Sequence, residues 1–200
     1  MRYGMVIDLR KCLGCMACTI ACKVENHTRP GIFWTRVKDE EVGKYPTVKR
    51  IFLPILCMHC QEPPCVKVCP NEASYQREDG IVMVDHDKCV GCKYCMTACP
   101  YGARHFNENG NGYFGPQLTA NEEIGYERHK VGVAEKCNFC IDRLEQGRKP
   151  ACVLTCIGKA RYLGDLDDPE SEVSQLIESR HGAPLLEELE TKPSVYYLPP

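Results

Sequence analysis

The sequence predicts an α+β fold of two small intertwined units, built from short helices, short hairpins and long loops. Three observations lead to this prediction. Sixteen cysteines in 200 residues fall into four groups of four. A sequence repeat surrounds these groups, and a hairpin signal joins the second group to the third. Such a cysteine content is typical of a disulfide or metal scaffold rather than of an ordinary apolar core.

The spacing of the cysteines is the strongest signal. Groups I and III have the spacing C-x2-C-x2-C-x3-C, which bacterial ferredoxins use: three cysteines wrap one cluster and the fourth ligates its neighbour. Groups II and IV widen the gap before the third cysteine to x4 and x11. We therefore expect four [4Fe-4S] clusters and two ferredoxin-like units. The groups are I (Cys12, Cys15, Cys18, Cys22), II (Cys57, Cys60, Cys65, Cys69), III (Cys89, Cys92, Cys95, Cys99) and IV (Cys137, Cys140, Cys152, Cys156).

Zinc and disulfides are the competing interpretations of so many cysteines. Zinc also uses C-x2-C pairs, but a structural zinc ion needs four ligands and gains nothing from a third cysteine at this spacing. A disulfide framework fits the even count, but three thiols within seven residues leave few pairs with good geometry. The spacing therefore favours iron–sulfur ligation.

The repeat and the turn residues predict the local structure around the groups. Residues 3–7 are expected to form a strand that leads into group I. Residues 74–77 and 81–84 flank Glu78-Asp79-Gly80, which predicts a hairpin. We expect the Cys-x3-Cys end of each group in a short helix, ended by Pro70 and Pro100 where these follow. Three groups continue as Cys-x3-Ala-x-aromatic, and we assign the alanines to packing: Ala73, Ala103 and Ala160.

The hairpin suggests how the groups pair. It joins groups II and III into unit B, residues 53–106, which leaves groups I and IV for unit A, residues 1–52 and 135–170. A tandem arrangement, I with II and III with IV, is the alternative. Residues 107–134 are a Gly/Asn-rich insert, expected to be a surface loop, with a docking loop as the other possibility. Residues 171–200 form a C-terminal extension.

Charge and hydropathy limit the partners. The net charge of −2 indicates neither nucleic acid nor an anionic membrane as a partner. No stretch approaches the ~20 apolar residues of a membrane helix, so we expect no direct membrane insertion. Residues 1–8 do not have the pattern of a secretory signal. We expect a periplasmic location through export with a partner, or a cytoplasmic one. Every cysteine belongs to a group, and we find no catalytic constellation in the remaining residues.

These motifs carry a family resemblance. The four groups, the endings Cys69-Pro70 and Cys99-Pro100, and the stretch Leu163-Gly164-Asp165-Leu166-Asp167-Asp168-Pro169 resemble the iron–sulfur subunits of molybdopterin oxidoreductases of the dimethyl-sulfoxide reductase family. Such subunits serve dimethyl-sulfoxide, polysulfide, thiosulfate, tetrathionate, nitrite and arsenate reductase systems. The resemblance covers residues 1 to about 170 and is specific for the four-cluster subunit, not for the substrate of its partner.

The resemblance implies a crossed set of ligands, here called sets 1 to 4. It also implies that unit A faces a large molybdopterin (Mo or W) catalytic subunit, and that unit B faces a membrane anchor or a cytochrome- or quinone-linked carrier. The sets are 1 (Cys12, Cys15, Cys18, Cys156), 2 (Cys22, Cys137, Cys140, Cys152), 3 (Cys57, Cys60, Cys65, Cys99) and 4 (Cys69, Cys89, Cys92, Cys95).

The expected function is therefore one-electron relay between these partners, as an electron-transfer subunit without a catalytic site of its own. A free polyferredoxin that shuttles electrons between soluble partners is the alternative. In nitrate-reductase relatives a tryptophan replaces the residue at the position of Cys92, and that cluster loses an iron. Because this chain keeps Cys92, all four clusters are expected to be [4Fe-4S].

Some other residues near the cysteines have weaker signals. A lysine precedes the first cysteine of three groups and could ease electron uptake, but exposed lysines are the common case. His59 lies between two cysteines of group II, where we expect an ordinary loop histidine. Trp34 is distant from every group and is expected to be a core or partner-facing aromatic residue. The three lysines are Lys11, Lys88 and Lys136.

Overall fold

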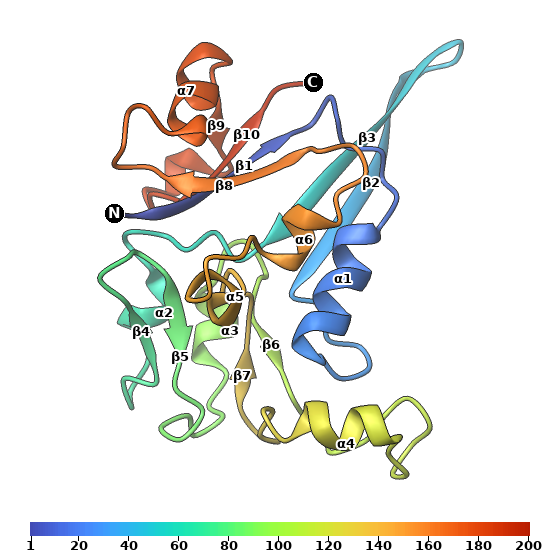
Figure 1. Cartoon of the computed structure of the whole chain (residues 1–200), viewed down its shortest axis with the longest axis vertical. Helices are drawn as coiled ribbons and strands as arrows, with labels where there is room; N and C mark the ends of the chain where they lie inside the picture. The colour runs from blue at the N-terminus through green and yellow to red at the C-terminus, as the bar shows by residue number, and fades with distance from the viewer.

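A four-stranded sheet with one helix forms the upper part of the molecule in Figure 1, in the computed structural model that describes residues 1–200. The strand order is β8-β1-β10-β9; β1 is antiparallel to β8 and parallel to β10. Because side chains alternate along a strand, Met5 and Ile7 enter the main core while Val6 packs toward the helix α7. The elements are β1 (Tyr3–Asp8), β8 (Arg161–Asp165), α7 (Glu172–Ser179), β9 (Ala183–Pro184) and β10 (Val195–Leu198).

A long hairpin extends from the body of the molecule (Figure 1). It consists of the antiparallel strands β2 (Thr35–Lys44) and β3 (Thr47–Leu56). The base is anchored by buried Ile55 and Leu56, whereas Tyr45 at the tip is 92% exposed. Strand β3 of the hairpin runs across the predicted boundary between residues 52 and 53.

Short helices hold the third cysteine of every group, but the predicted helix over the whole Cys-x3-Cys end is confirmed only for group I. In α1 both Cys18 and Cys22 lie within the helix; in the other three helices the fourth cysteine follows the last helical residue. Helix α1 packs beside α6, and α2 packs beside α3. Groups I and IV therefore lie together, as do groups II and III. The helices are α1 (Ala17–Asn26), α2 (Pro64–Lys67), α3 (Tyr94–Ala98) and α6 (Ala151–Leu154).

The predicted hairpin between groups II and III is present. Strands β4 (Ser74–Gln76) and β5 (Val82–Val84) pair antiparallel. The turn between them contains Gly80 with φ +81°, a conformation that glycine adopts without strain. The strand predicted over residues 3–7 is also confirmed, as β1.

The insert at residues 107–134 is not simply a loop, and this expectation was wrong. It begins after β6 (His105–Phe106), contains helix α4 (Ala120–Tyr126), and ends at β7 (Ala134–Glu135), which pairs antiparallel with β6. A capping box starts the helix: Thr119 accepts from the Glu122 N–H, and the Glu122 carboxylate accepts from the Thr119 N–H. The Gly/Asn-rich residues before it concealed this signal.

The C-terminal extension is part of the fold. Residues 171–200 supply α7, the 3-10 helix η1 (Glu187–Leu189) and strands β9 and β10. The segment also contacts group II, because Ser194 N–H donates to Met58 O and Gln61 N–H donates to Lys192 O. The C-terminal residues therefore connect the sheet to unit B.

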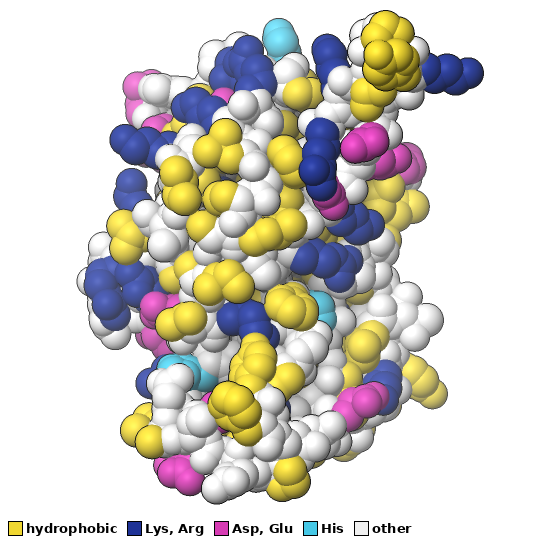
Figure 2. Space-filling view, turned by 90° about the vertical axis from the view of Figure 1, so that its right-hand side faces the viewer, with side chains coloured by type: hydrophobic (Ala, Val, Ile, Leu, Met, Phe, Trp, Pro, Cys, Tyr) yellow, Lys and Arg dark blue, Asp and Glu magenta, His cyan; other side chains and the backbone are white.

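The main core contains cysteines as well as aliphatic side chains. It runs from β1 and β10 through the base of the hairpin to group IV. No helix is both long and apolar enough to cross a lipid bilayer. Figure 2, which views the side of the molecule carrying α1, shows hydrophobic side chains across the middle of this face. The exposed apolar residues around α1 and the end of α6, here called the α1 patch, are Leu13, Met16, Ile20, Val24, Leu154 and Ile157.

Candidate iron–sulfur centre

All sixteen cysteines are unbridged thiols in this structure. Most are buried or half-buried, which places them inside the fold rather than on loops at its surface. Only Cys15 and Cys92 are exposed. These two are the second cysteines of groups I and III, so they occupy equivalent positions in the repeat.

Cysteines from different groups come together in unit B. One small cavity is lined by all four cysteines of set 3, together with Tyr101 and Arg104. A second is lined by all four cysteines of set 4. Each cavity thus receives three cysteines from one group and one from the other. Four thiols around one enclosed space are the donor set that a cubane cluster requires.

In unit A, cysteines of groups I and IV lie near one another. Burial raises the pKa of Cys12, and the charges of Cys18 and Cys156 raise it further. Burial likewise raises the pKa of Cys137, followed by the charges of Cys22, Cys152 and Cys140. The members of set 2 therefore lie close enough for their charges to interact, and group IV contributes to both neighbourhoods.

Burial makes several of the thiols poor acids in the absence of a positive partner. It raises the pKa of Cys60 to about 12 and that of Cys152 to about 11. A thiol binds metal as the thiolate, so a positively charged group must replace the proton and offset the desolvation. Quartets of thiols in a mostly apolar interior fit iron in this role.

Buried cations lie against the cysteines. The Arg104 guanidinium donates to Cys65 Sγ at 2.9 Å, and the Arg161 guanidinium donates to Cys18 Sγ at 3.4 Å. Lys136 is 4% exposed, so the expectation of an ordinary exposed lysine was wrong there. The sequence carried a signal for the arginines, since each directly follows the alanine of the Cys-x3-Ala repeat.

Further polar groups donate to sulfur. The backbone N–H of Ala160 donates to Cys156 Sγ at 3.2 Å. The side-chain amide of Asn26 lies 3.5 Å from Cys22 Sγ and 4.0 Å from Cys140 Sγ, so it contacts two members of set 2. Hydrogen bonds to sulfur are among the factors that set cluster potentials. No motif in the sequence marks Asn26 for this contact.

His59 lies in a loop, as the sequence suggested, but it is a core residue rather than an ordinary loop histidine. It is fully buried and stacks on Phe139, with ring centroids 3.8 Å apart. Its Nδ1 accepts a hydrogen bond from the Val82 N–H. Burial lowers the pKa of His59, which keeps the imidazole neutral. Both rings lie inside a C-x2-C motif, so the stack joins the loops of groups II and IV.

The remaining residues singled out in the sequence are two exposed lysines and a buried tryptophan. Lys11 and Lys88 are exposed, as expected. Trp34 is buried, and its ring centroid lies 6.0 Å from that of His129. It is therefore a core residue.

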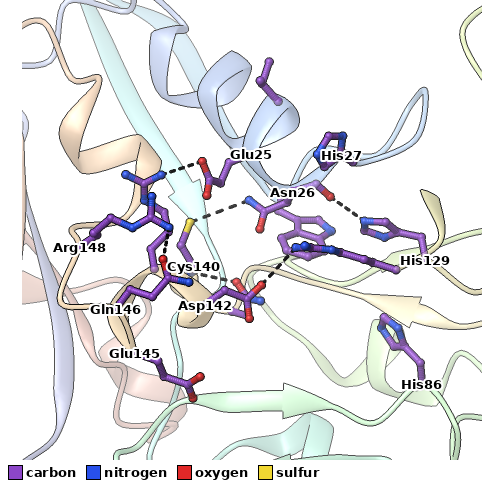
Figure 3. A pocket seen from close by; sticks show the side chains of 15 residues that line it. Glu25, Asn26, His27, His86, His129, Cys140, Asp142, Glu145, Gln146 and Arg148 are labelled. Atoms are coloured by element: carbon purple, nitrogen blue, oxygen red, sulfur yellow. Dashed lines mark hydrogen bonds and ion pairs between the residues drawn. The ribbon is translucent and has the colours of Figure 1, made fainter. Parts of the chain in front are cut away.

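A polar groove of about 960 Å³ opens beside set 2. Figure 3 shows Cys140 at the groove, with Asn26 of α1 pointing toward its sulfur and His129 on the opposite side of Asn26. Arg143 pairs with Glu25, and Arg128 pairs with Asp142, across its walls. Arg148 instead bonds to the Gln146 side chain, and Glu145 pairs with Arg77 outside the groove. The groove therefore carries side chains of both charges and no cluster of one sign.

Comparison with known proteins places the chain among iron–sulfur proteins. The family model of the 4Fe-4S dicluster domain matches residues 48–114 and 122–166. One subunit of the selenate reductase of Mesobacillus selenatarsenatis is 50% identical, over 98% of this chain and 72% of its own length. One subunit of the tetrathionate reductase of Salmonella typhimurium is 44% identical, over 98% of this chain and 72% of its own length. The arsenate respiratory reductase iron–sulfur subunit of a Shewanella species is 42% identical, over 99% of this chain and 96% of its own length.

Proposed function

Because this chain belongs to the 4Fe-4S dicluster family, among the iron–sulfur subunits of reductase complexes, we propose that its sixteen cysteines bind four [4Fe-4S] clusters. The chain is an electron-transfer subunit without a catalytic site of its own. When bound, the clusters supply one-electron redox chemistry. The observation that carries the proposal is the pair of cavities in unit B, each lined by four cysteines from two different groups.

The proposed ligands are sets 1 to 4 as defined above. In unit A, the neighbourhoods of Cys12 and Cys137 support sets 1 and 2. The packing of α1 beside α6 and of α2 beside α3 favours pairing group I with IV and group II with III over a tandem arrangement. Crossed ligation ties distant segments together, so each cluster would also stabilise the fold.

We propose that electrons enter and leave through sets 1 and 4. Cys15 of set 1 and Cys92 of set 4 are the two exposed cysteines, whereas every cysteine of sets 2 and 3 except Cys99 is buried. Partners that exchange electrons with the chain need access to a cluster, and exposed ligands provide the shortest approach. Sets 2 and 3 would then carry electrons between the two ends.

The partner proposed for set 1 is a large molybdopterin (Mo or W) catalytic subunit. The α1 patch surrounds this end of the chain, and an exposed apolar patch marks an interaction surface. A smaller group of exposed side chains adjoins set 4 and is proposed to face a membrane anchor or an external carrier. This α3 patch consists of Val68, Val90 and Tyr94.

The α1 patch favours a permanent complex over a free polyferredoxin. Ile20 and Val24 are 58% and 67% exposed, and Leu154 is 69% exposed. A freely diffusing carrier would keep these side chains in water, whereas a stable partner would cover them. The polar groove and the net charge of −2 suggest no nucleic acid as a partner.

Metal analysis tests the cluster count. Protein purified anaerobically is expected to contain about sixteen iron and about sixteen acid-labile sulfide per chain. About eight iron per chain would contradict the four-cluster proposal. Zinc in place of iron would contradict iron–sulfur ligation altogether.

Co-purification tests the partner. Native protein is expected to elute with a large chain that contains molybdenum or tungsten. Elution as a monomer, with full iron content and no such chain, would support the polyferredoxin alternative instead.

A further inference from the structure

The chain buries four cationic side chains: Arg29, Arg104, Lys136 and Arg161. A buried charge is costly unless a partner of opposite sign or a set of hydrogen bonds compensates it. The Arg29 guanidinium donates to the carbonyls of Gly110 and Asn111, remote from the cysteines. The other three have no buried carboxylate as a hydrogen-bond partner. Arg104 and Arg161 donate to thiols, and Lys136 donates to the backbone of a cysteine.

Arg161 lies between sets 1 and 2. Its guanidinium donates to Cys18 Sγ of set 1 at 3.4 Å and to Thr35 Oγ1 at 3.1 Å. Cys152 of set 2 is close enough that its charge acts on Arg161 even more strongly than that of Cys18. One buried guanidinium thus adjoins two sets.

Arg104 occupies the equivalent position between sets 3 and 4. It donates to Cys65 Sγ of set 3 at 2.9 Å and to Ser74 Oγ at 2.8 Å. Cys95 of set 4 also interacts with its charge. Ser74 holds the guanidinium in place and donates its own N–H to Cys69 Sγ of set 4, at 3.4 Å.

Lys136 lies between sets 2 and 3. Its ammonium donates to the carbonyl oxygen of Cys137, a member of set 2, at 2.6 Å. The charges of Cys57 and Cys65, both of set 3, also act on it. The neutral stack of His59 on Phe139 joins the two loops between the same two sets.

The internal repeat accounts for the positions of Arg104 and Arg161 but not for that of Lys136. Arg104 and Arg161 both follow Cys-x3-Ala, and both donate to the third cysteine of the group that pairs with their own. At the matching position after group II the chain has Ser74. The result is one buried cation in each of the three gaps between consecutive sets.

Resting on the four-cluster assignment of the proposed function, we propose that Arg161, Lys136 and Arg104 are fixed counter-charges, one in each gap, that raise the reduction potentials of the two clusters flanking them. Reduction adds one electron to a cluster, taken from the electron donor; no bond forms and no proton moves. The added negative charge is stabilised by a nearby cation, and strongly so where water is excluded. The three residues position charge and are not ligands.

The test is a redox titration followed by EPR on the protein purified with the partners it retains. In Arg161→Gln, Lys136→Gln and Arg104→Gln, the midpoint potentials of the two flanking clusters are expected to fall. At a fixed potential the ratio of reduced to oxidised cluster should drop about tenfold, equivalent to about 59 mV for one electron. The charge-retaining Arg161→Lys, Arg104→Lys and Lys136→Arg should stay within about twofold of wild type.

Arg29→Gln is the matched control, because it removes a buried cation that does not contact a cysteine; it should leave every midpoint unchanged. Unchanged midpoints in all three glutamine variants with full iron content would overturn the proposal. So would equal shifts in the charge-retaining and glutamine variants, which would indicate a packing role. If the glutamine variants lose iron, the charge-retaining variants must keep both iron and wild-type midpoints for the proposal to stand.

Failure of the cluster assignment is recognised separately. It would appear in the wild-type protein as an iron content well below about sixteen per chain. Full iron with unshifted midpoints in the variants would overturn only the counter-charge proposal.

Discussion

Cys92 is the single residue that most directly tests the proposed ligand sets. It lines the cavity of set 4 and is exposed at the surface, so a larger side chain can be accommodated toward solvent. We expect Cys92→Trp to remove one ligand and release one iron, giving a three-iron EPR signal and about fifteen iron per chain. The measurement is iron analysis together with EPR of the oxidised protein.

Tyr94→Trp is the control for this substitution. It places the same indole on exposed α3 while leaving every thiol intact, so iron content and EPR should match wild type. Unchanged iron and EPR in Cys92→Trp itself would show that Cys92 is not a cluster ligand.

His105 gives the chain a predictable response to acid. Burial, followed by the charges of Arg36 and Lys23, lowers the pKa of His105 to about 4, while Glu135 opposes the shift. An unfolded histidine titrates near pH 6.5. Between these values the unfolded state binds the extra proton, so this residue lowers the stability as the pH falls from about 6.5 toward 4.

Removal of the imidazole should therefore flatten that dependence. We expect the urea unfolding free energy of His105→Asn to fall less steeply than that of wild type between pH 6.5 and 5, measured anaerobically. The slope is compared rather than the absolute stability, because the substitution also changes packing. Parallel slopes for the two proteins would contradict the assignment.

The sequence predicts which residues form the cysteine groups, but only partly which side chains are buried. The sixteen cysteines and their grouping follow from spacing alone. Lys136 precedes a first cysteine just as Lys11 and Lys88 do, yet it alone is buried. The difference arises from the pairing of β7 with β6, which draws the start of group IV into the interior. Such pairing between distant segments leaves no local sequence signal.

Among the elements, α4 has a local signal in the sequence although residues 107–134 were expected to form a loop. Thr119-Ala120-Asn121-Glu122 has the capping-box pattern, and the structure contains both reciprocal hydrogen bonds. Strands β9 and β10 have no comparable local signal. Strand β10 pairs with β1, which lies almost the whole chain away in sequence. Local patterns predict hairpins and helices; parallel pairing between the two ends of the chain depends on the completed fold.

The capping box makes α4 sensitive to one hydroxyl. In Thr119→Ala the Glu122 N–H loses its side-chain acceptor, which should destabilise the helix by about 1 kcal/mol. We expect faster hydrogen exchange across residues 120–126 with unchanged cluster EPR spectra. Thr119→Ser, which keeps the hydroxyl, should exchange as slowly as wild type; equal exchange in all three proteins would show that the cap does not contribute.

At the scale of the whole molecule, the cysteine sets are inseparable from the core. Cys18, Cys22, Cys57, Cys137 and Cys152 pack among the aliphatic residues of the main core. Iron removal by a chelator under anaerobic reducing conditions would leave buried thiols around empty space, and the binding energy that holds distant segments together would be lost. We expect the cooperative thermal transition to disappear in circular dichroism. A chelated protein that melts at the temperature of the holoprotein would contradict this.

If electrons enter and leave beside the two exposed cysteines, as proposed, surface substitutions can test the two positions separately. Ile20→Lys places a charge in the α1 patch without touching a cysteine, and Tyr94→Lys does the same in the α3 patch. If the α1 patch binds the catalytic subunit, Ile20→Lys should weaken that association at least tenfold, since a buried interface lysine costs more than about 1.4 kcal/mol. Tyr94→Lys should leave the large subunit bound and slow reduction or oxidation by the external carrier.

Val131→Lys, at an exposed position in the 107–134 segment, should affect neither process. Size-exclusion chromatography with metal analysis reports the first effect, and stopped-flow absorbance of the clusters reports the second. Loss of the large subunit in Tyr94→Lys, with retention in Ile20→Lys, would reverse the proposed orientation of the chain.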